Sequence, residues 1–151
     1  MTIVSPAFED NQTIPVEYTC DGQNISPPLI FANIPPEAQS LALIMEDPDV
    51  PKSLRADGLF VHWLVWDMEP DIAEIPEGGE PPGFVGQNTS GSAGYTGPCP
   101  PDREHRYFFK LYALDVTLVE ARIANKDDLE KAMEGHILAN ATLMGRYNRK
   151  K

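Results

Sequence analysis

The side chains most able to carry chemistry are two histidines and a rigid acidic turn. His62 and His105 lie beside apolar runs of strand length, and the turn Glu46-Asp47-Pro48-Asp49-Val50-Pro51 directly follows another such run. Because proline fixes its backbone φ angle, the turn loses little entropy when it presents its carboxylates. Imidazoles can donate to phosphate oxygens, and carboxylates can orient imidazoles or pair with an amine. Hydrogen-bonded core histidines and a solvated turn are the alternatives.

A loop rich in glycine and proline, Gly94-Tyr95-Thr96-Gly97-Pro98-Cys99-Pro100-Pro101, is a third feature of this kind. Backbone N–H groups in such a loop can cradle an anion, but proline has none to offer. The donors are therefore those of Thr96, Gly97 and Cys99, and the prolines stiffen the loop. No Gly-Lys-Ser/Thr follows, so this is not a nucleotide-binding P-loop.

Short apolar runs bounded by turn residues must position these groups. They are rich in branched and aromatic residues and are typical of strands inside a sandwich, at residues 29–34, 41–46, 60–66 and 107–114. With their proline-rich connections they indicate a mainly β fold. The segment Asp67–Arg103 mixes apolar residues with prolines and glycines, and we expect a packed loop over one end of the sandwich.

The chain changes character after this β-rich part. Residues Lys126–Arg146 contain good helix formers, and Asn125 is a candidate N-cap. Apolar residues recur at helical spacing, and Gly135, beside the third histidine His136, divides the segment. We expect a helical segment that caps the sandwich, with a partner-binding face as the alternative.

The composition limits the class of protein. The chain has 151 residues, which suits one domain over residues 1–151, and its formal net charge of −11 repels nucleic acids and anionic membranes. The sequence shows no signal-peptide pattern and no apolar stretch long enough for a membrane span, so we expect a soluble, cytoplasmic protein. Cys20 and Cys99 are too few for a disulfide scaffold. Reduced core cysteines are expected, with a disulfide or a reactive thiol as the alternative.

Several motifs, taken in order, resemble signatures of the phosphatidylethanolamine-binding protein family in its bacterial and archaeal, Raf-kinase-inhibitor-like branch. They are Tyr18-Thr19-Cys20-Asp21-Gly22, Ser26-Pro27-Pro28-Leu29, Asp47-Pro48-Asp49-Val50-Pro51, His62-Trp63-Leu64-Val65, the loop 94–101, His105-Arg106-Tyr107 and Leu111-Tyr112-Ala113-Leu114. Leu129–Tyr147 is similar to the closing helices of the family, so the resemblance covers nearly the whole chain. It implies a sandwich of two antiparallel sheets, a C-terminal helical segment and a small anion pocket.

The resemblance also implies the residues of that pocket. Carried over by motif, they are Asp47, Pro48, Asp49, His62, Gly97, Pro98, Cys99, His105 and Tyr107. The linker Asp102-Arg103-Glu104 is shorter than the glycine-rich linker of many relatives, which leaves Arg103 able to point into the mouth. Charged histidines would hold an anion more tightly, so we expect tighter binding below a pH of about 6.5.

The expected function is binding of a small phosphorylated or otherwise anionic ligand, with a regulatory or inhibitory role toward a protein partner. The resemblance suggests a kinase or a protease as the partner and leaves a homodimer open; no catalysis, cofactor or metal is expected. One alternative is a hydrolase-type enzyme with His62 or His105 beside Asp47 as general base and Cys99 as nucleophile. Another is a metal site built from the two histidines and the aspartates.

Overall fold

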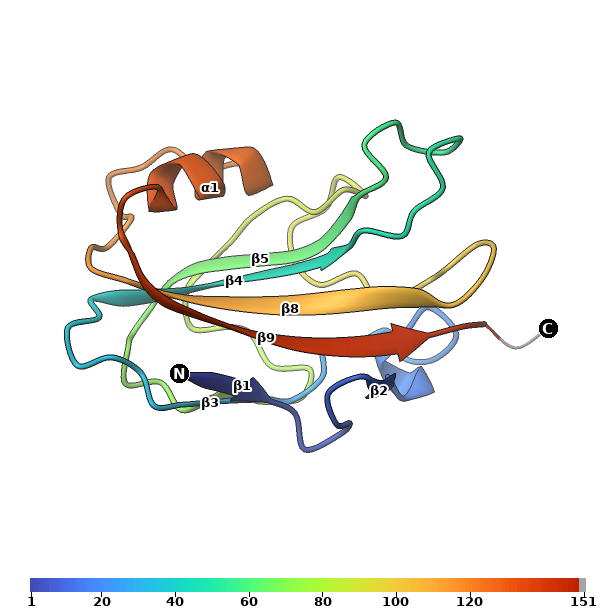
Figure 1. Ribbon diagram of the computed structural model, residues 1–151, viewed down its shortest axis with the longest axis horizontal. Coiled ribbons are helices and arrows are strands. Elements are labelled where there is room, and N and C mark those ends of the chain that lie inside the picture. Colours follow the sequence, from blue (N-terminus) through green and yellow to red (C-terminus); the bar gives the residue numbers. More distant parts are fainter. Residues whose placement is uncertain (150–151) are drawn as a thin grey trace.

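The computed structural model describes residues 1–149 and is dominated by one large sheet (Figure 1). Residues 150 and 151 of the predicted domain lie outside the described part. The six strands follow the order β2-β9-β8-β4-β5-β7. Neighbouring strands pair antiparallel, except that β2 pairs with β9 in parallel. Their bounds are β2 Gln12–Thr13, β4 Ser40–Asp47, β5 Phe60–Met68, β7 Phe84–Val85, β8 His105–Leu114 and β9 Ile137–Tyr147.

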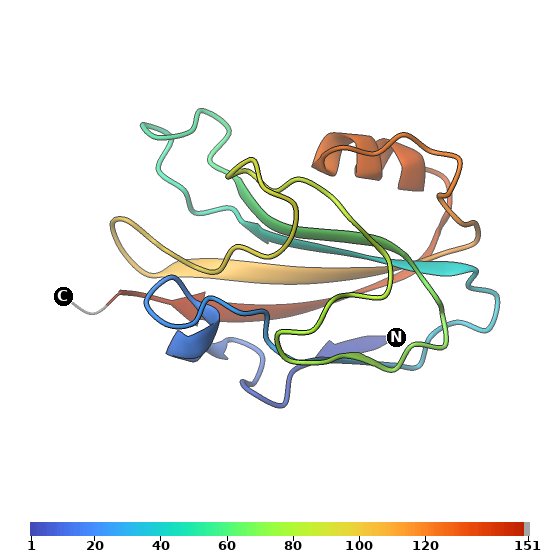
Figure 2. The same cartoon turned by 180° about the vertical axis from the view of Figure 1, so that it is seen from behind.

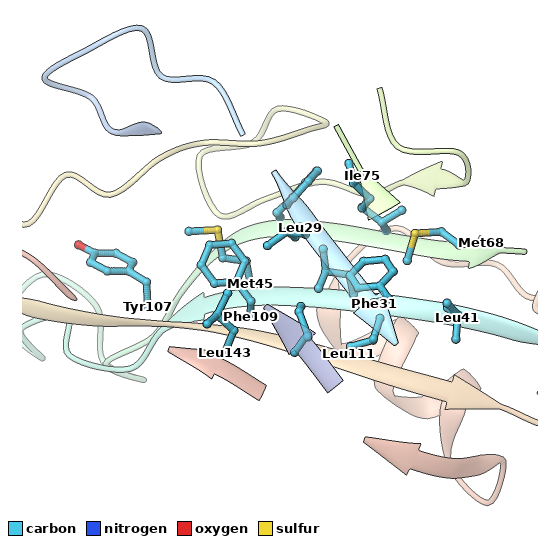
Figure 3. Packing of buried hydrophobic residues seen from close by; sticks show 14 of the residues in the cluster. Leu29, Phe31, Leu41, Met45, Met68, Ile75, Tyr107, Phe109, Leu111 and Leu143 are labelled. Carbon is cyan, nitrogen blue, oxygen red and sulfur yellow. The ribbon is translucent and has the colours of Figure 1, made fainter. Parts of the chain in front are cut away.

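A smaller sheet covers one face of the large sheet (Figure 1). Its order is β1-β3-β6, with β1 Thr2–Val4, β3 Leu29–Ala32 and β6 Glu74–Ile75. The predicted mainly β sandwich of two sheets is thereby confirmed, and the four predicted strands correspond to β3, β4, β5 and β8. Alternate residues of each strand point into the main core; Figure 3 shows Leu29 and Phe31 of β3 among Met45, Phe109 and Leu111 of the large sheet.

The helix α1, Lys126–Met133, lies on the opposite face of the large sheet (Figure 1). Leu129 and Met133 are buried against the sheet in a second apolar cluster. The predicted N-cap is confirmed, because the Asn125 side chain accepts a hydrogen bond from the backbone N–H of Asp128. Within residues 1–149, no helix combines the length and apolarity that a membrane crossing needs.

The prediction of helical structure as far as Arg146 is wrong, because α1 ends at Met133 and β9 follows. Gly135 adopts a φ of 81°, a left-handed conformation that glycine accepts readily, and it reverses the chain into the strand. Beyond it, the residues on the core-facing side are Ala139, Ala141, Leu143, Gly145 and Tyr147. Their spacing of two is the period of a strand, and pairing along the whole length of β8 satisfies the backbone of β9.

The segment between β5 and β8 is packed, as expected, and follows one side of the sandwich before it reaches one end (Figure 2). It contributes β6 to the smaller sheet and β7 to the larger one, so it borders an edge of both. Ile75 is fully buried within it, and Ile72, Val85 and Tyr95 pack against the main core. The end that it reaches also holds the loop from β4 to β5 and the start of β8 (Figures 1 and 2).

Candidate functional site

A cavity of about 380 Å³ opens at this end of the sandwich. That volume falls within the range of about 300–1,000 Å³ that is typical of small-ligand sites. Of the residues predicted for the pocket, the cavity is lined by Asp47, His62, Gly97, Cys99, His105 and Tyr107. The structure therefore gathers both predicted histidines, one aspartate and part of the predicted loop around one space. Pro48, Asp49 and Pro98 do not line it.

Asp47 and Asp49 face different surroundings, although they lie in the same turn. Asp47 is the last residue of β4 and points to the core side, where its Oδ1 atom accepts the N–H of Asp49 at 2.7 Å. Asp49 pairs instead with Arg106 on the outer face, through Nε at 2.9 Å and Nη2 at 2.7 Å. The expectation that Asp49 lines the pocket is therefore wrong. Its hydrogen bonds with Arg106 hold the pKa of the Asp49 carboxyl near 2.

A β-bulge places His62 on the cavity side of β5. Met45 and Glu46 on β4 pair with Trp63 and Val61, so His62 is an extra residue on the facing strand. A bulge redirects side chains locally, and here it brings the His62 ring to 5.3 Å from that of Tyr107. Without the extra residue, the alternation of the strand would direct His62 away from Trp63, toward the face that α1 covers.

The protonation of His62 is constrained by one backbone contact. Its Nδ1 atom lies 2.5 Å from the carbonyl oxygen of Thr96. A carbonyl only accepts, so Nδ1 carries the hydrogen. Burial lowers the pKa of His62 from its ordinary 6.5 to about 4. The ring is consequently neutral at physiological pH, and its Nε2 atom is an acceptor.

His105 is held between two carboxylates. Its Nδ1 atom lies 2.6 Å from Asp47 Oδ2, and its Nε2 atom lies 2.6 Å from Asp102 Oδ1. Both contacts are satisfied together when both nitrogens carry hydrogen, or when one carboxyl holds the proton instead. Burial raises the pKa of Asp47, whereas the hydrogen bond from His105 lowers the pKa of Asp102. Neither nitrogen of His105 is left for a ligand, contrary to the expectation that both histidines contact the anion.

Tyr107 presents a buried hydroxyl without a partner. The residue is fully buried at the start of β8, and no atom within residues 1–149 forms a hydrogen bond with its hydroxyl oxygen. Figure 3 shows the ring at one end of the apolar cluster, with its hydroxyl directed away from the other labelled side chains. Burial raises the pKa of Tyr107, so the group is a neutral donor. A buried polar group without a partner costs stability, and a ligand in the cavity would satisfy it.

The loop 94–101 is fixed by a disulfide between Cys20 and Cys99. The expectation of two reduced core cysteines is therefore wrong in both respects, since both residues are also exposed. The two segments interlock further because Gly97 donates its N–H to Asn24 Oδ1 at 2.8 Å, and a Cβ on Gly97 would lie 2.3 Å from the carbonyl oxygen of Tyr18. A larger side chain at Gly97 cannot be accommodated there without separating the segments.

The backbone donors expected from this loop are mostly engaged. Thr96 donates its N–H to the carbonyl of His62 at 3.1 Å, and the N–H of Gly97 is used as described. Asn88, which is buried, stabilises the same loop through its amide, at 3.0 Å from both Gly94 O and Thr96 Oγ1. The loop acts chiefly as a wall that sets the orientation of His62. Of the three backbone donors predicted in this loop, the N–H of Cys99 is the one for which the described residues provide no acceptor.

Sequence reasoning missed the residues at the mouth of the cavity. Arg103 donates to its neighbour Glu104 and does not line the cavity, whereas Arg55 does. The other missed lining residues are Val50, Leu54, Phe60, Thr89 and Pro101, while Thr96, predicted as a backbone donor, also lines the cavity. Val50, which follows Asp49 in the turn, and Phe60, which precedes Val61, could have been predicted because they are close in sequence to predicted site residues. No motif in the neighbouring sequence indicates that Arg55 or Thr89 lines the cavity.

The structure changes what the two alternative chemistries could use, although His62 keeps its Nε2 atom free. Cys99 is bonded to Cys20 and is not a free thiolate, and His105 has both nitrogens engaged. In the described part of the chain, no group of three or more His, Cys, Asp and Glu side chains is arranged to hold a metal ion. A larger cavity of about 460 Å³ is lined by Trp63, Tyr95 and Glu80 but by no histidine. The candidate site is therefore the cavity at His62.

The two-sheet sandwich with a cavity at one end defines a class of fold, and comparisons with known proteins place the chain within it. A model of the phosphatidylethanolamine-binding protein family matches residues 4–148. A UPF0098 protein of Chlamydia pneumoniae is 53% identical over 149 residues, covering 99% of this chain and 99% of that protein. A UPF0098 protein of Methanothermobacter thermautotrophicus is 48% identical over 155 residues, again covering 99% of each.

A solved structure also matches this chain closely. The crystal structure of a phosphatidylethanolamine-binding protein homologue from Chlamydia trachomatis matches with a TM-score of 0.95 and 48% sequence identity, covering 99% of this chain and 97% of that chain. The chain belongs to the phosphatidylethanolamine-binding protein family, as the motifs in the sequence indicated. Family membership implies ligand binding in general terms.

Proposed function

We propose that this protein binds a small phosphoryl anion in the cavity at His62 and is not an enzyme. The observation that carries the proposal is the buried hydroxyl of Tyr107, a donor that lines the cavity and has no partner within residues 1–149. Such groups are rare in folded proteins unless a ligand or water completes them. An anion with several acceptor oxygens is a suitable partner for this donor.

The other polar groups of the cavity favour a phosphoryl group that still carries one proton. The neutral His62 ring accepts at Nε2 and can take the P–OH hydrogen, while Tyr107 donates to another oxygen. Arg55 lines the mouth and has a guanidinium that can approach a third oxygen. A monoanion therefore satisfies acceptor and donor together, with no need to charge a buried histidine.

Absence of catalysis is part of the proposal. Nucleophilic catalysis needs an activated nucleophile, and Cys99 is held in the disulfide. A regulatory or inhibitory role toward a protein partner, and a homodimer, are proposed from the family resemblance. Sedimentation with and without ligand, and capture of a partner by wild type but not by a pocket variant, would test them.

The deciding experiment is calorimetric titration of ethyl phosphate at pH 5.5 into wild type and His62→Ala. We expect a millimolar dissociation constant, about 4 kcal/mol, that the variant loses. His136→Ala is the matched control, because His136 is partly exposed and lies between α1 and β9, outside the cavity lining. Absence of heat in the wild type, or equal binding by His62→Ala, would overturn the proposed site.

A further inference from the structure

The disulfide between Cys20 and Cys99 ends in the wall of the candidate cavity. Cys99 and Pro101 both line that cavity. They belong to the stretch of residues 98–101, so the position of this stretch determines the shape of the wall. The contacts that hold residues 98–101 in place therefore also hold part of the ligand site.

Residues 98–101 have few hydrogen bonds of their own. All but Cys99 are prolines, which have no N–H to donate, and the N–H of Cys99 has no acceptor within residues 1–149. The backbone of the stretch is bonded where the carbonyl of Pro98 accepts the N–H of Cys20 at 3.1 Å. The disulfide of Cys99 leads to the same residue. Cys20 thus supplies both the covalent bond and the hydrogen bond that hold this part of the wall.

The segment around Cys20 is anchored by contacts that do not involve the disulfide. Asp21 accepts a hydrogen bond from the hydroxyl of Tyr147 at 2.7 Å and another from Nη2 of Arg149 at 2.9 Å. These contacts tie the segment to the C-terminal end of β9. When the disulfide opens, the Cys20 side therefore keeps its anchor, and the side that gains freedom is Cys99.

A small dithiol can reach the bond, because Cys20 and Cys99 are both exposed. A thiolate of the dithiol attacks one sulfur and forms a mixed disulfide with it, while the other cysteine leaves as a thiolate and takes up a proton. The second thiol of the reagent then closes its own disulfide and releases the remaining cysteine. The protein is reduced by two electrons and the dithiol is oxidised by the same two.

We infer that this disulfide regulates the ligand site: reduction by a dithiol weakens binding of the phosphoryl anion while the fold persists. This inference rests on the proposed function and adds its regulation. Pro98 and Pro100 are buried, so their packing keeps the stretch against the fold after reduction. Cys99 is exposed and gains rotational freedom, so the ligand must order this part of the wall when it binds. An ordering cost of this kind lowers affinity.

The first test is calorimetric titration of ethyl phosphate at pH 5.5 into three forms of the protein. They are oxidised wild type, wild type reduced with dithiothreitol at pH 8 and then freed of the reagent under nitrogen, and Cys20→Ser/Cys99→Ser. Thiols are protonated at pH 5.5 and reoxidise slowly, and thiol labelling after the titration confirms the state. We expect the reduced protein and the double variant to bind about fivefold more weakly than the oxidised protein.

Each outcome of this titration decides a different point. Equal affinities of the oxidised and reduced forms would overturn the inference and leave the proposed function standing. Absence of binding by the oxidised form would overturn both. Near-UV circular dichroism at the titration temperature reports whether the reduced form is folded. A reduced form that is unfolded would also overturn the inference, because regulation requires a folded reduced state.

Thermodynamic linkage provides a second test, which a disulfide without influence on the site would fail. If the oxidised form binds ethyl phosphate more tightly, the ligand stabilises the disulfide by the same factor. In a buffer of reduced and oxidised dithiothreitol, saturating ethyl phosphate should shift the equilibrium about fivefold toward the disulfide. His62→Ala is the matched control, because it keeps both cysteines but lacks the proposed acceptor. No shift in wild type, or an equal shift in His62→Ala, would overturn the inference.

Discussion

His62 donates from Nδ1 to the carbonyl oxygen of Thr96 at 2.5 Å, and this contact determines what the other side of the ring can do. Since the donor position is used, the neutral ring can only accept from a ligand through Nε2. The contact thereby turns the loop 94–101, which carries few free donors of its own, into a determinant of ligand chemistry.

The first prediction concerns the proton on the ligand. At pH 5.5 ethyl phosphate is a monoanion with one P–OH, whereas ethyl sulfate is a monoanion with none. Because Nε2 of His62 accepts, we expect ethyl phosphate to bind at least about tenfold more tightly than ethyl sulfate, as buried polar groups left unpaired cost that much. Competition calorimetry measures the ratio. Equal affinities would contradict the assignment of His62 Nε2 as the acceptor of the ligand's proton.

The pH dependence of binding follows from the same contact. A phosphate monoester loses its second proton near a pH of about 6, so its affinity should fall above that value. Charging of His62 is not the cause, because burial lowers its pKa to about 4. The affinity for ethyl sulfate should consequently stay flat between pH 6 and 8 and increase only toward pH 4. This replaces the sequence-based explanation, in which protonation of both histidines below about 6.5 strengthens binding.

The second prediction concerns stability in acid. The unfolded state binds a proton at His62 below 6.5, whereas the folded state does so only below about 4, so stability decreases as pH falls through this window. The loss amounts to about 3 kcal/mol by pH 4. Urea unfolding of wild type and His62→Gln at pH 7 and pH 4.5 measures it, and the variant should show the shallower decline. His136→Gln, at a partly exposed histidine, should decline like wild type.

The third prediction separates binding from stability at Tyr107. Tyr107→Phe removes a buried hydroxyl that has no partner in the described structure, so the free energy of unfolding should stay equal or increase by about 1 kcal/mol. Affinity for ethyl phosphate should fall about tenfold in the same variant, because a hydrogen bond to a charged group is lost. Thermal unfolding and calorimetry give the two values. A large loss of stability would show that the hydroxyl has a partner within the fold.

The fourth prediction concerns the disulfide. Cys20 and Cys99 are separated by 79 residues, and opening so long a loop should cost about 2–4 kcal/mol of stability. Thermal unfolding of wild type should shift downward in dithiothreitol, because both residues are exposed. The double variant Cys20→Ser/Cys99→Ser should already unfold at the lower temperature and ignore the reductant. Unfolding of wild type that is insensitive to the reductant would contradict the prediction.

The disulfide also bears on the compartment. Disulfides persist in oxidising surroundings and are rare in the cytosol, which is opposed to the expectation of a cytoplasmic protein. Thiol labelling of protein trapped in acid directly from cells shows which state is present. Labelling of both cysteines would favour the reducing compartment, and protection of both would favour an oxidising one.

Much of the site could be predicted because its residues lie in local motifs at strand ends. Asp47, His62, His105 and Tyr107 each belong to a short, recognisable stretch, and the family resemblance of these stretches implied one pocket. Chain geometry then decided the details that no motif contains. Arg106 follows His105 on the opposite face of β8, so it meets Asp49 outside the cavity and removes that carboxylate from the site.

Two of the wrong predictions are the helix in place of β9 and the reduced cysteines. Both concern residues whose partners are distant in sequence. The residues of β9 suit a helix by local propensity, yet ten residues of β8 pair with them across the sheet. The period-two pattern of Ala139, Ala141, Leu143 and Tyr147 was visible in the sequence and could have favoured a strand. The bond between Cys20 and Cys99 depends on two loops meeting, which neither spacing nor composition reveals.

Because His62 is the extra residue of a bulge, the number of residues in β5 decides whether its ring faces the cavity. Deleting either Phe60 or Val61 would keep His62 in β5. The deletion would nevertheless allow β5 to pair with β4 without a bulge. The imidazole would then rotate to the helix-covered side, and the chain would gain regular pairing while losing the acceptor that His62 presents to the cavity.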